Sequence, residues 1–282
     1  MKKSVLAIIA LSLCSLSFAQ LPGARSPQEQ SEDAAVLSKK HAIDAAPRSP
    51  LADPGCSFLF TSGANNTFLS YCLTTNGNVT QLITPAGHLE IVNPVEGYGI
   101  CDGFTGTEYF DYAFEDSLNW GPTTATSLSP TAMKFVRTTS DGAWTLTQTI
   151  TQVASSSLVK VAMALKNNTA DNRPVVLLRY ADVDVDGVLA NNFDGTLNSA
   201  MAWNSFFSGA HPFGLALQNV GTSPFDYNGF AQTIPGIVHP CNTFANASRT
   251  VAVGIDGSLV MAYQGVMPKK ASKTFTVSYK GL

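Results

Sequence analysis

A regular alternation of apolar and polar residues, with a period of two, runs through the chain from Cys56 onward and constrains its fold. Trp144, Leu146 and Ile150 alternate with threonines over residues 145–151, and turn residues separate this run from the next. Such a pattern is typical of half-buried antiparallel strands. One face of this strand is therefore expected to pack into a core, while its threonine face meets solvent or a ligand.

Similar runs recur along the chain and predict an all-β fold. Each strand has an apolar face to bury, so we expect a large antiparallel two-sheet β-sandwich of roughly a dozen strands after a flexible N-terminal segment. No repeat of fixed period is found, which disfavours a propeller. The predicted strands are 79–83, 88–92, 107–114, 132–138, 144–151, 159–166, 175–186, 200–206, 213–217, 249–255, 258–264 and 273–280.

The N-terminus has the features of a cleavable signal peptide over residues 1–19. Lys2 and Lys3 precede an apolar stretch, and residues 17–19 form a small-x-small cleavage site. We expect a secreted or periplasmic protein with no membrane span, because this stretch is shorter than the roughly 20 residues that cross a bilayer. A lipid anchor at Cys14 is disfavoured, since the residue before it is Leu13 rather than a small residue.

The remaining chain divides into two parts by composition. Residues 20–54 are polar and contain no aromatic side chain, which predicts a flexible linker; a removable pro-segment is the alternative. Residues 55–282 contain no linker-like stretch. We therefore expect them to form a single β-sandwich domain.

The balance of charge restricts the partners. Loss of the two signal-peptide lysines leaves 15 of 17 basic residues against 20 acidic ones, a net charge of about −5. No basic tract in the sequence matches the phosphates of a nucleic acid, so we expect no nucleic-acid partner. The sequence gives no indication of oligomeric state.

The cysteines of the expected mature chain suggest two disulfides, as an even number does in an oxidising compartment. Residues 57–60 and 68–71 look like matched arms around a loop, which favours a bond between Cys56 and Cys72. The second bond would then join Cys101 to Cys241. Four free thiols are the alternative, and the lack of a CxxC pair or a nearby histidine disfavours zinc.

A run of alternating aspartates, residues 182–187, is the strongest candidate for a metal site. The run either continues a strand with three carboxylates on one face, or bends at Asp186-Gly187 and wraps a cation as the first half of an EF-hand loop does. All the candidate donors are oxygens, which suits structural calcium. A solvated acidic edge and a catalytic role are the alternatives. The candidate ligands are Asp182, Asp184, Asp186, Asn192 and Asp194.

Residues 108–116 interleave acids with aromatics, as a sugar-binding surface would. Paired carboxylates there suit glycoside hydrolysis, whereas an ordinary strand with a buried aromatic face is the alternative. The catalytic candidates are Glu108, Asp111 and Glu115. The candidates for ligand contact are Tyr109, Trp120 and Trp203, and Trp120 lies in a turn that either displays its indole or packs it inward.

Three hypotheses for function follow from these features. The favoured one is a secreted, cation-stabilised module that binds a polysaccharide, a cell-surface glycan or another macromolecule. The second is an extracellular carbohydrate-active enzyme, a glycoside hydrolase or a polysaccharide lyase. The third is a structural protein of an envelope or matrix. No nucleophile elbow, phosphate-binding loop or dinucleotide fingerprint supports other chemistry.

Overall fold

The computed structural model describes residues 55–91, 95–113, 116–153, 156–204, 213–223, 225–232, 239–243 and 251–282. The expected signal peptide and linker, residues 1–54, lie outside this part of the chain. The described strands are β1 (Phe58–Ser62), β2 (Leu69–Leu73), β3 (Val79–Ile83), β4 (Leu89–Ile91), β5 (Val95–Asp102), β6 (Thr107–Ala113), β7 (Thr124–Ser129), β8 (Ala132–Thr138), β9 (Trp144–Val153), β10 (Leu158–Asn167), β11 (Arg173–Asp182), β12 (Asn191–Gly195), β13 (Ser199–Asn204), β14 (Phe213–Asn219), β15 (Asp226–Gln232), β16 (Ala252–Ile255), β17 (Ser258–Met267) and β18 (Ser272–Gly281). Short 3₁₀ helices are η1 (Asn65–Thr67), η3 (Val185–Gly187) and η4 (Pro240–Asn242).

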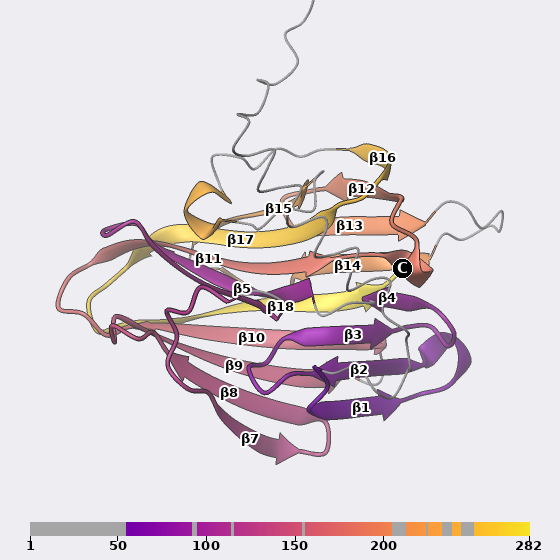
Figure 1. Ribbon diagram of the computed structural model, residues 1–282, viewed down its shortest axis with the longest axis horizontal. Helices are drawn as coiled ribbons and strands as arrows, with labels where there is room; N and C mark the ends of the chain where they lie inside the picture. Colours follow the sequence, from indigo (N-terminus) through magenta and orange to yellow (C-terminus); the bar gives the residue numbers. More distant parts are fainter. Residues whose placement is uncertain are drawn as a thin grey trace, which may run out of the picture.

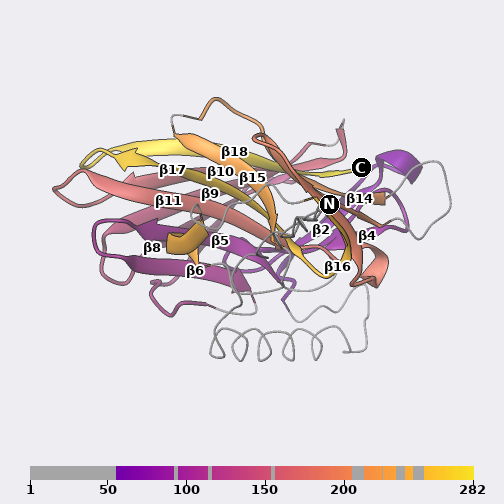
Figure 2. The ribbon, with the colours of Figure 1, turned by 90° about the horizontal axis from the view of Figure 1, so that it is seen from above.

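The strands form three antiparallel sheets, which confirms the predicted all-β antiparallel fold. Four strands follow the order β1-β2-β3-β4, and nine follow the order β16-β12-β13-β14-β18-β10-β9-β8-β7. Five more follow the order β15-β17-β11-β5-β6, and most of these are seen side by side in Figure 2. The described part therefore holds more strands than the dozen expected from the sequence.

The two smaller sheets cover one face of the nine-stranded sheet (Figure 1). The four-stranded sheet reaches it through Gln152 of β9, whose amide contacts the hydroxyl of Ser62 in β1. The five-stranded sheet reaches it through Arg179 of β11, which donates to Tyr279 of β18 at 2.8 Å. One layer of the expected sandwich is thus divided into two sheets, and one apolar core joins all three sheets.

The alternating residues of β9 and β10 pack as their pattern predicts. Trp144, Leu146 and Ile150 are buried in the core, while the threonines between them are partly exposed. In β10, Val161 and Met163 are fully buried and the lysines on the opposite face are exposed. Side chains alternate across a strand, so the same alternation separates a core face from an open face along this sheet.

A charged group lies within this core. Arg179 is fully buried and donates to Glu96, also fully buried, through Nε at 2.5 Å and Nη2 at 2.8 Å. Its Nη1 donates to Gln148, and its Nη2 donates also to the carbonyl of Gly77. A buried ion pair of this kind needs such complete hydrogen bonding to offset the loss of water.

Both predicted disulfide pairings are present. Cys56 is bonded to Cys72, with 5.2 Å between their Cα atoms, beside the ladder that pairs β1 with β2. Cys101 at the end of β5 is bonded to Cys241 in η4, with 4.8 Å between their Cα atoms. The second bond fixes a segment from late in the chain onto the five-stranded sheet.

Candidate functional site

The aspartate run does not continue as one strand. Strand β11 ends at Asp182, and η3 follows at Val185–Gly187. Asp186 and Gly187 both have positive φ, at 55° and 76°. The chain therefore bends at Asp186-Gly187, which is the second of the two geometries expected from the sequence.

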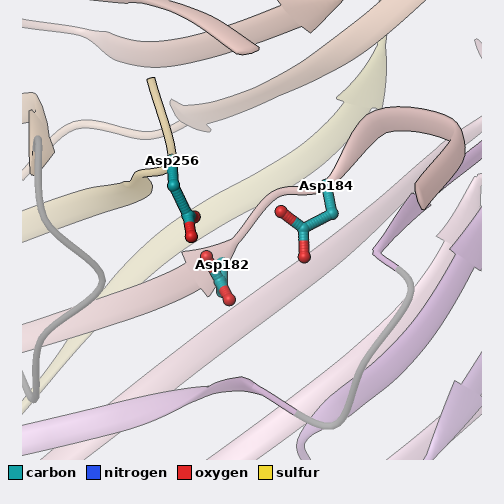
Figure 3. Close-up of side chains that lie close together, drawn as sticks. All are labelled: Asp182, Asp184 and Asp256. Atoms are coloured by element: carbon teal, nitrogen blue, oxygen red, sulfur yellow. The ribbon is translucent and has the colours of Figure 1, made fainter. Parts of the chain in front are cut away.

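Three carboxylates converge beside this bend (Figure 3). Asp182 and Asp184 meet Asp256 of the turn between β16 and β17, and one oxygen from each lies within 4.8 Å of the others. Ser258 donates to Asp182 at 3.2 Å, and its hydroxyl also lies 2.8 Å from that of Tyr180. Like charges this close repel strongly where water is restricted, and Asp182 and Asp184 are buried. The cluster can therefore hold a metal ion.

The other predicted ligands lie elsewhere. Asp186 accepts the N–H of Leu89 at 2.9 Å and contacts His88 Nδ1 at 3.0 Å, so it connects η3 to β4. Asn192 accepts the N–H of Gly254 at 3.1 Å, and Asp194 lies further along β12. Asp256, which joins the cluster instead, was missed because Asp256-Gly257 is a strong hairpin turn signal.

The catalytic candidates of β6 point in different directions. Glu108 accepts from Cys241 N–H at 2.8 Å and lies 2.9 Å from His239 Nδ1. Partial burial favours its neutral form, but hydrogen bonds from His239 and from the Cys241 amide outweigh it and lower the Glu108 pKa. These contacts hold Glu108 against η4. The third catalytic candidate, Glu115, lies outside the described residues.

Asp111 lies in a separate polar cluster near Trp120. Arg137 of β8 donates to Asp111 at 2.5 Å and to Asp116 at 2.9 Å, so it bridges two carboxylates. Asn76 donates to Asp111 at 2.9 Å. Burial raises the pKa of Asp111 despite the nearby guanidinium. Arg137 was not predicted, because β8 and β6 belong to different sheets and no local motif joins them.

Two of the three predicted ligand-contact residues are buried. Trp120 is 8% exposed, with the Arg137 guanidinium 5.2 Å from its ring centre. Tyr109 is 1% exposed and donates to Asp141 at 2.6 Å. The indole of Trp120 is thus packed inward, the second of the two expected arrangements. A ligand reaches at most the edges of these rings, and their binding role stays a prediction.

Trp203 differs from these two residues because it faces away from the core. Its neighbours Ala202 and Asn204 are buried, whereas Trp203 is partly exposed, so alternation places it on the opposite face of β13. We call this side of the nine-stranded sheet, turned away from the two smaller sheets, the outer face. Gly214 pairs with Trp203, and a Cβ there would lie 2.8 Å from Trp203 Cβ. The indole therefore borders a position that needs glycine.

No family model matches the chain, and no curated protein does. Among solved structures, a bacterial glucoamylase complexed with acarbose matches with 11% identity and a TM-score of 0.53, covering 82% of this chain and 32% of that one. This chain thus spans about a third of the glucoamylase. A putative aldose 1-epimerase from Escherichia coli K12 matches with 11% identity and a TM-score of 0.41, covering 80% and 99%. A galactose mutarotase-like protein from Lactobacillus casei ATCC 334 matches with 9% identity and a TM-score of 0.40, covering 80% and 100%.

At these identities the comparison with glucoamylase shows a shared β-sandwich fold and nothing about shared residues. Within the described ranges, no helix is both long and apolar enough to cross a membrane. A role for this chain must therefore be argued from its own side chains.

Proposed function

We propose that this chain is an exported glycan-binding protein that holds its ligand on the outer face, at Trp203. One observation carries the proposal: of the three aromatic candidates, only Trp203 is partly exposed on an open sheet face, while Trp120 and Tyr109 are buried. An indole offers a large apolar ring together with an N–H donor. That combination suits a sugar ring, whose faces carry C–H groups and whose rim carries hydroxyls.

Substitution of Trp203 by alanine tests the proposal. Loss of a stacking aromatic from a binding site costs binding energy of a few kcal/mol, so we expect Trp203→Ala to weaken glycan binding at least roughly tenfold. The measurement is affinity electrophoresis of the mature protein in gels containing dextran, amylose or polygalacturonate. Phe104→Ala is the matched control, because Phe104 is an exposed aromatic in the turn after β5. Equal retardation of Trp203→Ala and the parent protein would overturn the proposal.

Calcium at Asp182, Asp184 and Asp256 forms a second part of the proposal. Support comes from the convergence of three carboxylates in a largely buried setting, where a divalent cation removes their repulsion. Carboxylate oxygens are the ligands that calcium prefers. The cation would join the end of β11 to the hairpin between β16 and β17, which is a structural role.

Thermal unfolding tests this cation site. A ligand that binds only the folded state stabilises it by about 2.7 kcal/mol at a concentration one hundred times its Kd. We therefore expect added calcium to raise the Tm and a chelator to lower it. Asp256→Asn should remove most of that response, whereas Asp194→Asn should retain it. An identical Tm with calcium and with chelator would reject the cation site.

Export is the third part, and it is supported by the disulfides. Bonds such as Cys56–Cys72 and Cys101–Cys241 persist in oxidising compartments. Together with the signal-peptide features of residues 1–19, they favour a secreted or periplasmic protein. N-terminal sequencing of the protein recovered from outside the cytoplasm tests this part, with a start at Gln20 as the expected result.

A carbohydrate-active enzyme is the second candidate, favoured by the paired carboxylates Asp111 and Asp116. Burial raises the pKa of Asp111, while Asp116 is more exposed, and such a difference separates an acid from a base. Release of new reducing ends or unsaturated products from the same polysaccharides would support it. Activity should then fall strongly in Asp111→Asn and persist in Asp171→Asn, an exposed turn variant.

A further inference from the structure

The outer face is free of acidic residues over most of its width. Seven neighbouring strands, from β13 through β14, β18, β10, β9 and β8 to β7, contain no aspartate or glutamate (Figure 1). On the β12 side the first acid is Asp194, which lies opposite Met201, and β7 forms the other edge of the sheet. In the adjoining turns, Asp141 and Asp171 lie at the ends of strands. The whole chain has a net charge of −3, so this surface departs from the rest of the molecule.

Four lysines project from this acid-free surface. Lys160 and Lys166 are exposed on β10, Lys280 is exposed on β18, and Lys134 is partly exposed on β8. In each strand the lysine alternates with core residues, such as Val161 of β10, so it points outward. The surface is therefore both open and cationic.

The strand registers place three of these lysines along one diagonal. Lys280 lies opposite Leu158, two residues from Lys160 on the neighbouring strand. Such diagonal neighbours are about 8 Å apart. Lys134 lies opposite Thr149, which lies opposite Ala162, so it is two strands and two residues from Lys160. Strand spacing and rise give about 12 Å for that step.

The same diagonal leads to Trp203. Lys280 pairs with Ala216, which pairs with Met201, and Trp203 follows Met201 by two residues on β13. Trp203 is thus about 12 Å from Lys280, and the whole row extends about 30 Å. Three small or hydroxyl side chains beside the row are partly exposed, namely Thr149, Thr151 and Ala162, whereas Ser278 is buried. The two threonines can therefore offer hydroxyl partners to a linear chain.

We propose that Trp203, Lys280, Lys160 and Lys134 form a track for a linear acidic polysaccharide, carrying carboxylate or sulfate groups. This inference rests on the glycan-binding function proposed above and adds the charge class of the ligand. Charge complementarity favours an anionic polymer. Cations about 8–12 Å apart suit a polymer charged once per sugar or per two sugars, whereas DNA strands carry a phosphate every 3.4 Å or so. The threonine hydroxyls add hydrogen bonds that sugars accept and donate.

Lys166 offers a matched control for the track. It is an exposed lysine on β10 and on the same face, but it lies six residues from Lys160, about 20 Å along the strand and away from the diagonal. A variant that replaces Lys134, Lys160 and Lys280 by glutamine removes the row and preserves side-chain length. Lys166→Gln changes the charge of the same face while leaving the row intact.

The test measures binding of the full mature protein to polygalacturonate, chondroitin sulfate, dextran and a double-stranded DNA fragment at two salt concentrations. Each exposed charge contact changes the binding affinity by a few-fold at most. We therefore expect the triple variant to bind the acidic polysaccharides roughly tenfold more weakly than the parent protein does. Lys166→Gln should bind as the parent does. A higher salt concentration should weaken the binding of the acidic polysaccharides to the parent protein and have little effect on their binding to the triple variant. Polygalacturonate and chondroitin sulfate distinguish carboxylate from sulfate recognition.

The outcomes separate this inference from the proposed function. Binding to dextran that depends on Trp203, with no preference for acidic polymers and no effect of the triple variant, would overturn the track and leave glycan binding intact. Absence of binding to every polysaccharide would overturn both. Tighter binding to DNA than to either acidic polysaccharide would also reject the track as a glycan site. A final outcome is a loss of binding in Lys166→Gln as large as that in the triple variant. That result would show that the overall charge of the face, rather than the diagonal row of lysines, binds the polymer, and it would reject the track.

Discussion

Glu90 of β4 shows how one buried side chain can control the stability of this fold. It is fully buried, and neither carboxylate oxygen makes a hydrogen bond with a described residue. Burial, together with the negative charge of Asp186, raises the pKa of Glu90 to about 8 from its usual value of 4.5. The folded protein therefore keeps this group neutral at pH values where the unfolded chain ionises it.

We expect stability to fall as pH rises from about 4.5 towards about 8, because over this range the unfolded chain binds fewer protons at this site. The full shift corresponds to a loss of folding free energy on the order of 5 kcal/mol at high pH. Glu90→Gln should raise the free energy of unfolding at pH 8.5 and change it little at pH 4. Urea unfolding at both pH values measures this. A larger stabilisation at pH 4 would contradict the assignment.

At the scale of the elements, the alternating runs could be predicted and the irregular ones could not. Strands β3 and β8 have the bounds expected from period-two alternation. Strand β5 was missed because Gly97 and Gly99 interrupt its pattern, yet Gly97 leaves no room for a side chain beside the Asp111 carbonyl. Strands β12 and β15 were missed because their Asn, Asp and Gly residues read as turns. Tertiary pairing overrides local preference in these cases.

The residues of the candidate sites also fall into two groups, those that local sequence predicts and those that depend on strand pairing. Local sequence alone predicted that Asp182 and Asp184 contribute to one carboxylate cluster, and it nominated Trp203, whose binding role stays a prediction. Asp256 and the lysine row depend on which strands become neighbours and in which register, and neither property can be read from one strand. The distance in sequence between Lys134 and Lys280 is the reason that no motif joined them.

The two disulfides should differ in their contribution to stability. Cys56–Cys72 closes a separation of 16 residues, and Cys101–Cys241 closes one of 140. Loop-closure entropy assigns them about 3 and about 5 kcal/mol respectively. We expect the paired Cys101→Ser and Cys241→Ser variant to lose more free energy of unfolding than the paired Cys56→Ser and Cys72→Ser variant. Urea unfolding compares them, and the reverse order would show that strain or residual structure outweighs chain entropy.

At the scale of the whole molecule, the shared core predicts that the described sheets unfold together. Leu82 of β3, Leu177 of β11 and Val161 of β10 belong to one cluster of buried residues, although they come from three different sheets. Loss of any sheet would expose the apolar faces of the others. Near-ultraviolet circular dichroism of buried Trp144 and far-ultraviolet circular dichroism of the strands should therefore give coincident transitions. Two separated transitions would show that one sheet is independently stable.

Strand β18 is the last described strand to be synthesised, and the nine-stranded sheet cannot be completed without it. It lies between β14 and β10, so it is the only described strand that joins β7–β10 to β12–β14 and β16 in the nine-stranded sheet. Its residues, Ser272–Gly281, emerge from the ribosome after those of every other described strand. The widest sheet therefore stays in two halves, with an open edge on each, until residue 281 has been released. A nascent chain of this kind cannot complete its widest sheet before β18 has emerged, and until then its exposed edges need protection.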